Sequence, residues 1–119
     1  MDLIELEIMK MEHGVSYTNS YAVILLEKNG NRTLPVVIGS NEARSIAIGL
    51  EQMETPRPLT HDLITNIFDE MNVVFEYVHI HKIVDGIFHA HIICKNEDTG
   101  VSHAVDSRTS DALAVAVRV

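Results

Sequence analysis

Apolar and polar residues alternate from Leu3 to Met9, and this two-residue period is typical of a half-buried strand. Two β-rich runs follow, 21–26 and 33–38, on either side of the turn signal Asn29-Gly30-Asn31. They predict a β-hairpin. Pro35 has no backbone N–H to donate, so the second strand of this hairpin is expected at a sheet edge or at a bulge.

The middle of the chain changes to the period of an α-helix. A helix is predicted after Gly39, where Ser40 or Asn41 can cap its start. A second helix is predicted after the proline-containing segment 55–58, with Thr60 as its cap. The apolar spacing predicts their buried faces, which are Ala43, Ile46, Ala47, Leu50 and Met53 in the first helix and Leu63, Ile64, Ile67, Phe68 and Met71 in the second.

The last third of the chain predicts a long hairpin, a short strand and a final helix. Runs 73–84 and 87–94 enclose Asp85-Gly86, a strong hairpin signal, and are followed by a strand over 101–105 and a helix over 112–117. The whole order is a strand, a hairpin, two helices, a hairpin, a strand and a helix. It predicts an α+β fold with a mostly antiparallel or mixed sheet and helices packed on that sheet.

Length and composition indicate one compact domain over residues 1–119, because 119 residues that are 46% hydrophobic can bury a core of their own. The sequence stops at Val119 without a capping or breaking residue, so we expect the last helix and the domain to continue further. The lone Cys94 excludes an internal disulfide. No stretch approaches the ~20 apolar residues of a membrane span, and the first residues lack the basic start of a signal peptide. We therefore expect a soluble cytoplasmic protein with no membrane partner.

The formal net charge of −8 argues against a broad electrostatic surface for nucleic acid, because a polyanion is repelled by it. The four lysines are spread along the chain and form no basic stripe. Any contact with nucleic acid is therefore expected in a local cleft that carries arginine, or where a divalent metal screens the acids.

The junction between the last strand and the last helix, the 106–111 segment, holds two acids, an arginine and three hydroxyls. A helix start offers backbone N–H groups and a favourable dipole to an anion, while carboxylates can hold a cation. An equally simple interpretation is that Ser107, Thr109 or Ser110 caps the helix and Asp111 complements its dipole. Both interpretations stay open at the level of sequence.

The 57–62 segment repeats this chemistry at the start of an earlier helix, with an arginine, a hydroxyl, an imidazole and a carboxylate. Cleavage of a phosphodiester needs positive charge for the phosphate, a group that moves a proton near neutral pH, and often a metal held by carboxylates. No glycine pattern for an organic nucleotide cofactor is present. The expected catalytic residues are His61, Asp62, Asp106 and Asp111, the expected phosphate-binding residues are Arg57, Arg108, Thr60 and Ser110, and the expected ligands of Mg²⁺ or Mn²⁺ are Asp62, Asp106 and Asp111.

Four of the seven histidines form two His-x-His pairs, 79–81 and 89–91, on facing strands of the long hairpin. Counting outward from the Asp85-Gly86 turn pairs His81 with Ala90, which divides the four histidines two and two between the faces of the sheet. A single four-histidine site is excluded on this register. Either pair could recruit one more ligand for zinc, but surface or interface histidines are the favoured interpretation.

Five stretches, in this order and spacing, resemble the bifunctional nuclease domain family, formerly a domain of unknown function. They are 34–39, Glu42-Ala43 with Ile46, 57–63, 85–90 and 105–112, and the resemblance extends over about residues 20–118. It implies a compact, commonly self-associating α+β domain with nuclease activity on DNA and RNA. Thr109 stands where proline is usual in the family, and proline suits the first turn of a helix.

Two functions therefore compete. The first is a metal-assisted nuclease that acts on DNA and RNA. The second is a non-catalytic, self-associating module that binds a small anion or a regulatory partner, in which Arg57 and Arg108 only tie loops to carboxylates of the same fold. A homo-oligomer is expected in both cases.

Overall fold

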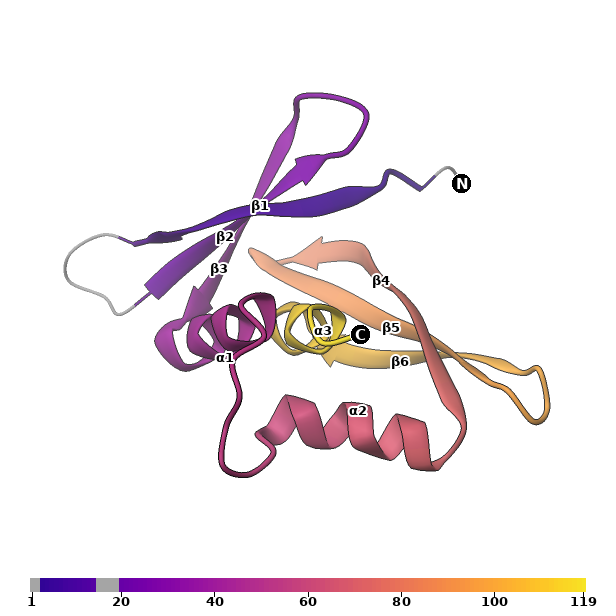
Figure 1. Ribbon diagram of the computed structural model, residues 1–119. Helices are drawn as coiled ribbons and strands as arrows, with labels where there is room; N and C mark the ends of the chain where they lie inside the picture. The colour runs from indigo at the N-terminus through magenta and orange to yellow at the C-terminus, as the bar shows by residue number, and fades with distance from the viewer. Residues whose placement is uncertain (1–2, 15–19) are drawn as a thin grey trace. The chain divides into compact units, whose positions relative to one another are not determined.

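The computed structural model describes residues 3–14 and 20–119 (Figure 1). The chain divides into two units, one up to Ala43 and one from Arg44 onward, and the boundary falls inside the first helix. The fold is α+β, and the predicted order of elements is confirmed. The elements are β1 (Leu6–His13), β2 (Ser20–Glu27), β3 (Thr33–Gly39), α1 (Ser40–Leu50), α2 (Thr60–Glu70), β4 (Val73–Val84), β5 (Ile87–Asn96), β6 (Ser102–Arg108) and α3 (Thr109–Ala116). Within the described ranges, every helix is too short or too polar to cross a bilayer.

The first unit is an antiparallel sheet in the order β1-β2-β3. The first strand starts at Leu6 instead of Leu3 and continues to His13, where it pairs with Tyr21. The predicted hairpin of β2 and β3 is confirmed, and Pro35 lies in an edge strand as expected. Val23 and Val36 form a directly paired, buried couple, so the alternation along these strands sets one apolar face.

The second unit combines the antiparallel sheet β4-β5-β6 with α2 and α3, which lie on the same face of that sheet (Figure 1). Its core is formed by small and medium apolar side chains that interlock between the sheet and the helices. The buried members are Ala90, Ile92 and Cys94 from β5 and Ala112 and Val115 from α3. Because strand side chains alternate, the residues between these members of β5, His91 and Ile93, face away from the helices.

Two predicted helix faces are wider than the observed ones. Ile64 and Phe68 of α2 pack on the core, but Leu63, Ile67 and Met71 are exposed. The apolar period correctly identifies the helix, but only some of the apolar side chains of α2 contact the core. In the first helix, the predicted member Met53 lies beyond the last helical residue.

The long hairpin has the predicted turn, with φ of 51° at Asp85 and 78° at Gly86. Positive φ at both central residues is the geometry that favours Asp-Gly. The register then shifts between Lys82, which pairs with His89, and Ile80, which pairs with Ala90. A β-bulge at His81 therefore moves His79 opposite His91, and the predicted division of the histidines between two faces is wrong. The count from the turn fails because one extra residue in a strand reverses every later face.

Candidate functional site

Helices α2 and α3 start without the predicted hydroxyl caps. The N-cap of α2 is Leu59, and its backbone N–H donates to Oδ2 of Asp62 at 2.9 Å, while Thr60 is already helical. The N-cap of α3 is Arg108, whose side chain makes no capping bond. Thr60 therefore does not cap α2, and no hydroxyl of the 106–111 segment caps α3. The carboxylates of Asp62 and Asp111 lie in the first turns, where they interact favourably with the helix dipole, as expected for Asp111.

The hydroxyls of the 106–111 segment have other partners. Thr109 is buried in the first turn of α3, and its Oγ1 donates to the carbonyl of Phe88 in β5 at 3.3 Å. Ser107 Oγ donates to the carbonyl of Arg108 at 2.6 Å. Ser110 is only 8% exposed, so it offers little surface to the phosphate contact that the sequence suggests.

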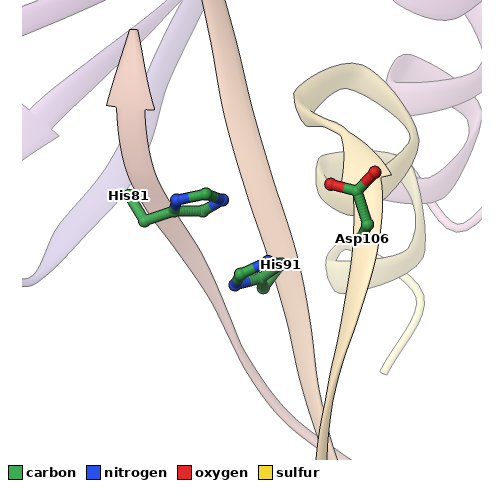
Figure 2. Close-up of side chains that lie close together, drawn as sticks. All are labelled: His81, His91 and Asp106. Carbon is green, nitrogen blue, oxygen red and sulfur yellow. The ribbon is translucent and has the colours of Figure 1, made fainter.

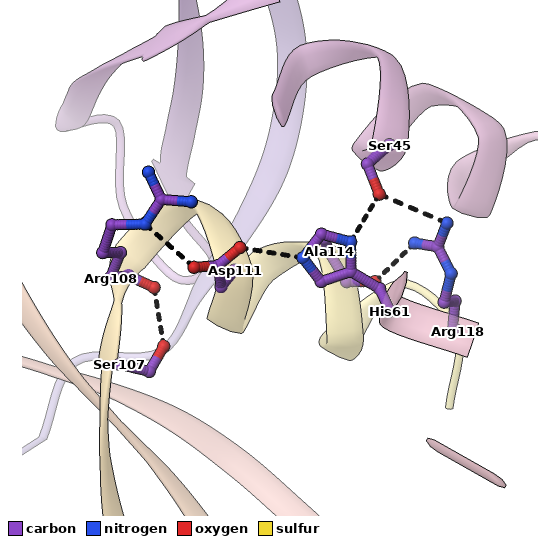
Figure 3. A network of polar contacts seen from close by, with 7 residues as sticks. All are labelled: Ser45, His61, Ser107, Arg108, Asp111, Ala114 and Arg118. Atoms are coloured by element: carbon purple, nitrogen blue, oxygen red, sulfur yellow. Dashed lines mark hydrogen bonds and ion pairs between the residues drawn. The ribbon is translucent and has the colours of Figure 1, made fainter. Parts of the chain in front are cut away.

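The 57–62 and 106–111 segments meet at a hydrogen bond between His61 and Asp111 (Figure 3). His61 is 9% exposed, and its Nε2 lies 2.9 Å from Oδ1 of Asp111. A carboxylate only accepts, so Nε2 carries the proton of this bond. The second oxygen of Asp111 accepts from Nε of Arg108, also at 2.9 Å. One carboxylate thus joins a buried imidazole to a guanidinium whose side chain is 67% exposed.

The other ring nitrogen of His61 contacts α1. Its Nδ1 lies 2.7 Å from Oγ of Ser45, and this Oγ also accepts from Nη2 of Arg118 at 3.4 Å. With one proton on Nε2, the neutral imidazole accepts at Nδ1, and the Ser45 hydroxyl is its donor. The order of donors runs from Arg118 through Ser45 and His61 to Asp111 (Figure 3).

Arg118 anchors the far end of this network. Its side chain is 6% exposed, and its Nε donates to Oδ1 of Asp62 at 2.8 Å. Its Nη1 donates to the carbonyl of Ala114 at 2.7 Å. Through these bonds and the contact with Ser45, one guanidinium connects α1, the start of α2 and the end of α3. The position of His61 therefore depends on a residue 57 positions further along the chain.

Both carboxylates of the network are held in the charged form. Partial burial acts to raise the pKa of Asp62, but the hydrogen bonds from the Leu59 N–H and from Arg118 outweigh it, so the pKa lies below its ordinary value. Burial likewise opposes ionisation of Asp111, and the hydrogen bonds from Arg108 and His61 again lower its pKa on balance.

The remaining predicted site residues lie outside this network. Arg57 and Thr60 are exposed around the start of α2. Asp106 lies in β6 opposite His91, on the face of the sheet that points away from α2 and α3. The structure thus brings together His61, Asp62, Asp111 and Arg108 of the predicted residues, through Ser45 and Arg118.

The carboxylates predicted to bind one Mg²⁺ or Mn²⁺ do not form one cluster. Both oxygens of Asp62 and both oxygens of Asp111 accept hydrogen bonds within the fold, and each of these carboxylates is already paired with an arginine. Asp106 is grouped instead with His81 and His91, the group of potential metal-binding side chains found among residues 3–14 and 20–119. A hard divalent cation prefers several oxygen ligands in an octahedral arrangement, and this donor set does not fit it.

Sequence reasoning missed Ser45 and Arg118. Ser45 lies in the middle of a helix, and Arg118 stands alone in an apolar terminus, so neither belongs to a local motif.

The architecture and the two helix starts define an α+β protein in which a buried histidine is paired with a partly exposed aspartate, and that aspartate with an exposed arginine. The family model of the bifunctional nuclease domain matches residues 23–119, so the chain belongs to this family. Two similar proteins are the uncharacterized proteins MT1877, from Mycobacterium tuberculosis strain CDC 1551 / Oshkosh, and Rv1829, from strain ATCC 25618 / H37Rv. Each is 39% identical over 101 residues, which is 85% of this chain and 58% of the relative. The chain therefore spans little more than half the length of these relatives.

Proposed function

We propose that this chain is a nuclease that hydrolyses phosphodiester bonds of DNA and RNA. The observation that carries the proposal is the carboxylate of Asp111, which accepts one hydrogen bond from His61 and one from Arg108. It places a group suited to proton transfer near neutral pH beside an exposed positive charge. Membership of the bifunctional nuclease domain family supports the same reaction class.

In this proposal Arg108 contacts a phosphate oxygen, because its side chain is the exposed cation of the network. His61 acts as general base through Ser45: a water oxygen forms the new bond to phosphorus, its proton passes to Oγ of Ser45, and the serine proton passes to Nδ1 of His61. Asp111 stabilises the resulting imidazolium. The bond from phosphorus to the leaving sugar oxygen breaks, and that oxygen then takes up the proton that His61 returns.

The other predicted residues have peripheral roles here. Arg57 and Thr60, both exposed at the start of α2, contact neighbouring phosphates of an extended strand. Such a local arginine surface is consistent with a formal net charge of −8, which disfavours binding of long duplexes over the whole molecule. The proposed reaction assigns no step to Mg²⁺ or Mn²⁺. We also propose that the protein is located in the cytoplasm.

The direct test is cleavage of fluorescently labelled single-stranded DNA and RNA by purified wild-type protein, His61→Gln and Asp111→Asn. Asp69→Asn is the matched control, because it removes one exposed carboxylate from α2 outside the network. We expect each network variant to lose about 100-fold or more in rate, within the range for a lost general base, while the control keeps its rate. Each reaction is run with added Mg²⁺, with Mn²⁺ and with chelator. Cleavage that is equal in all four proteins comes from a contaminant and would overturn the assignment.

A second candidate is a non-catalytic, self-associating module that binds a small anion at Arg108. The specific observation in its favour is that His61 and Arg118 are buried and bonded to groups of the same fold, as in a purely architectural network. On this account Asp111→Asn lowers the free energy of unfolding or dissociates the oligomer, and the wild type shows no cleavage. Chemical denaturation and analytical ultracentrifugation of the same variants separate the two candidates.

A further inference from the structure

The face of the sheet β4-β5-β6 that points away from α2 and α3 carries a cluster of histidines and one carboxylate. His79 and His91 are directly paired, and His91 is also paired with Asp106 across the next strand boundary. Directly paired residues share a face of the sheet. His79, His91 and Asp106 therefore occupy neighbouring positions on the three strands.

The bulge at His81 completes this cluster. In a β-bulge two residues oppose one residue of the partner strand, and here His81 and Lys82 together oppose His89. The ring of His81 therefore turns to the same side as His91, and the two imidazoles stack with centroids 4.0 Å apart. Without the extra residue, His81 would point to the face that contains the apolar core.

We propose that His81, His91 and Asp106 form a binding site for a transition-metal ion of the zinc type (Figure 2). One potential ligand atom from each side chain lies within 4.8 Å of the other two. Ligand atoms around a tetrahedral zinc ion are about 3.3 Å apart, given bonds of about 2.0 Å. Metal binding therefore requires rotations of these side chains that bring the ligand atoms closer, and the exposed side chain of Asp106 has room to rotate.

An unsatisfied ring nitrogen supports this assignment independently. Nε2 of His81 is shielded from solvent and has no hydrogen-bond partner in the part of the chain that the structure describes. A buried polar atom without a partner is costly unless a ligand satisfies it.

The chemistry of the donors selects the class of ion. Two imidazoles and one carboxylate suit Zn²⁺ and related first-row ions, whereas Mg²⁺ prefers oxygen ligands throughout. Two further imidazoles are near enough to supply a fourth ligand, since the ring of His81 lies 5.9 Å from that of His79 and 6.3 Å from that of His89. The site is formed by side chains outside the His61 network and does not depend on the proposed nuclease activity.

Titration of the purified chain with Zn²⁺ against a chromophoric chelator tests this site. We expect one high-affinity Zn²⁺ per chain and at least about 10-fold weaker binding in His81→Ala, His91→Ala and Asp106→Asn, because each removes one of the proposed ligands. His103→Ala is the matched control, since His103 is an exposed histidine in the same strand as Asp106. Its affinity should equal that of the wild type.

A second readout does not depend on the folding of the variants. Co²⁺ added to the wild-type chain should give the visible absorption of a tetrahedral site, and Zn²⁺ should abolish it by displacement. NMR signals of the His81 and His91 rings should shift on addition of Zn²⁺, while those of His103 stay in place. The proposal is overturned if Zn²⁺ does not bind, if the ring signals of His81 and His91 do not change, or if the ligand variants bind as tightly as His103→Ala.

Discussion

Replacement of Arg118 by alanine is the perturbation to which the network should be most sensitive. It removes the hydrogen bonds to Asp62, to the carbonyl of Ala114 and to Ser45 in one step. The lost charge also leaves the Asp62 carboxylate without its guanidinium partner. Residues on α1, α2 and α3 are all affected, so the expected consequence is global destabilisation.

The magnitude follows from burial. Breaking a buried ion pair costs about 3–5 kcal/mol, because one charge remains uncompensated. The side chain of Arg118 is 6% exposed but that of Asp62 is 34% exposed, so water can solvate the remaining carboxylate in part. The lower end of the range applies, and we expect a loss of about 3 kcal/mol with a fall in melting temperature of about 10 °C for a domain of this size.

Urea denaturation followed by circular dichroism measures this loss. Arg44→Ala is the matched control, because Arg44 is exposed on α1, and it should change the free energy of unfolding by less than about 0.5 kcal/mol. The double variant Arg118→Ala/Asp62→Asn should lose less free energy of unfolding than the two single variants lose together, since it also removes the uncompensated charge. If Arg118→Ala is as stable as Arg44→Ala, Arg118 does not hold the network together.

Three further predictions concern charge, the start of α3 and a close helix approach. The fold lowers the pKa values of Asp62 and Asp111, so their contribution to stability is complete above the ordinary value of 3.8 and is lost as the pH falls through the folded values. The free energy of unfolding should therefore change less between pH 6 and pH 3 in Asp62→Asn than in wild type. An equal change in the two proteins would contradict this. Thr109→Pro should change the free energy of unfolding by less than about 1 kcal/mol, because Thr109 is the first helical residue and Arg108 before it is already extended, at φ −66° and ψ 144°. A large fall in the melting temperature would refute this. Gly49→Ala should lower the free energy of unfolding by about 2 kcal/mol despite the better helix propensity of alanine, since the added Cβ would lie 2.5 Å from a methyl group of Val117, just after α3. A higher melting temperature than that of the wild type would contradict this.

The elements were largely predictable because their signals are local. Alternation, the Asp-Gly turn and the apolar spacing of helices each depend on residues within a few positions of one another, and the structure confirms the order that they indicate. The exact helix starts were less predictable. Thr109 begins α3 three residues before the expected Ala112, because residues 106–108 continue β6 beside β5 and the helix follows directly.

The site was predictable only in part, because its bonds join distant positions. His61 and Asp111 were expected from their chemistry, but they are 50 positions apart, and no local pattern states that they meet. The partner of Asp62 is 56 positions away, at Arg118. The grouping of the histidines was predicted wrongly, because the bulge at His81 shifts the register of the hairpin and leaves no pattern in the sequence.

A double-mutant cycle on nucleic-acid cleavage tests the central claim, that His61 and Asp111 act as one unit, most directly. The rates of wild type, His61→Ala, Asp111→Ala and the double variant are compared on the same labelled RNA, after each variant is shown to be folded. Groups that act as a unit are strongly non-additive, so we expect the double variant to be about as slow as either single variant. Losses that multiply, or cleavage that continues in the double variant at the wild-type rate, would contradict the account.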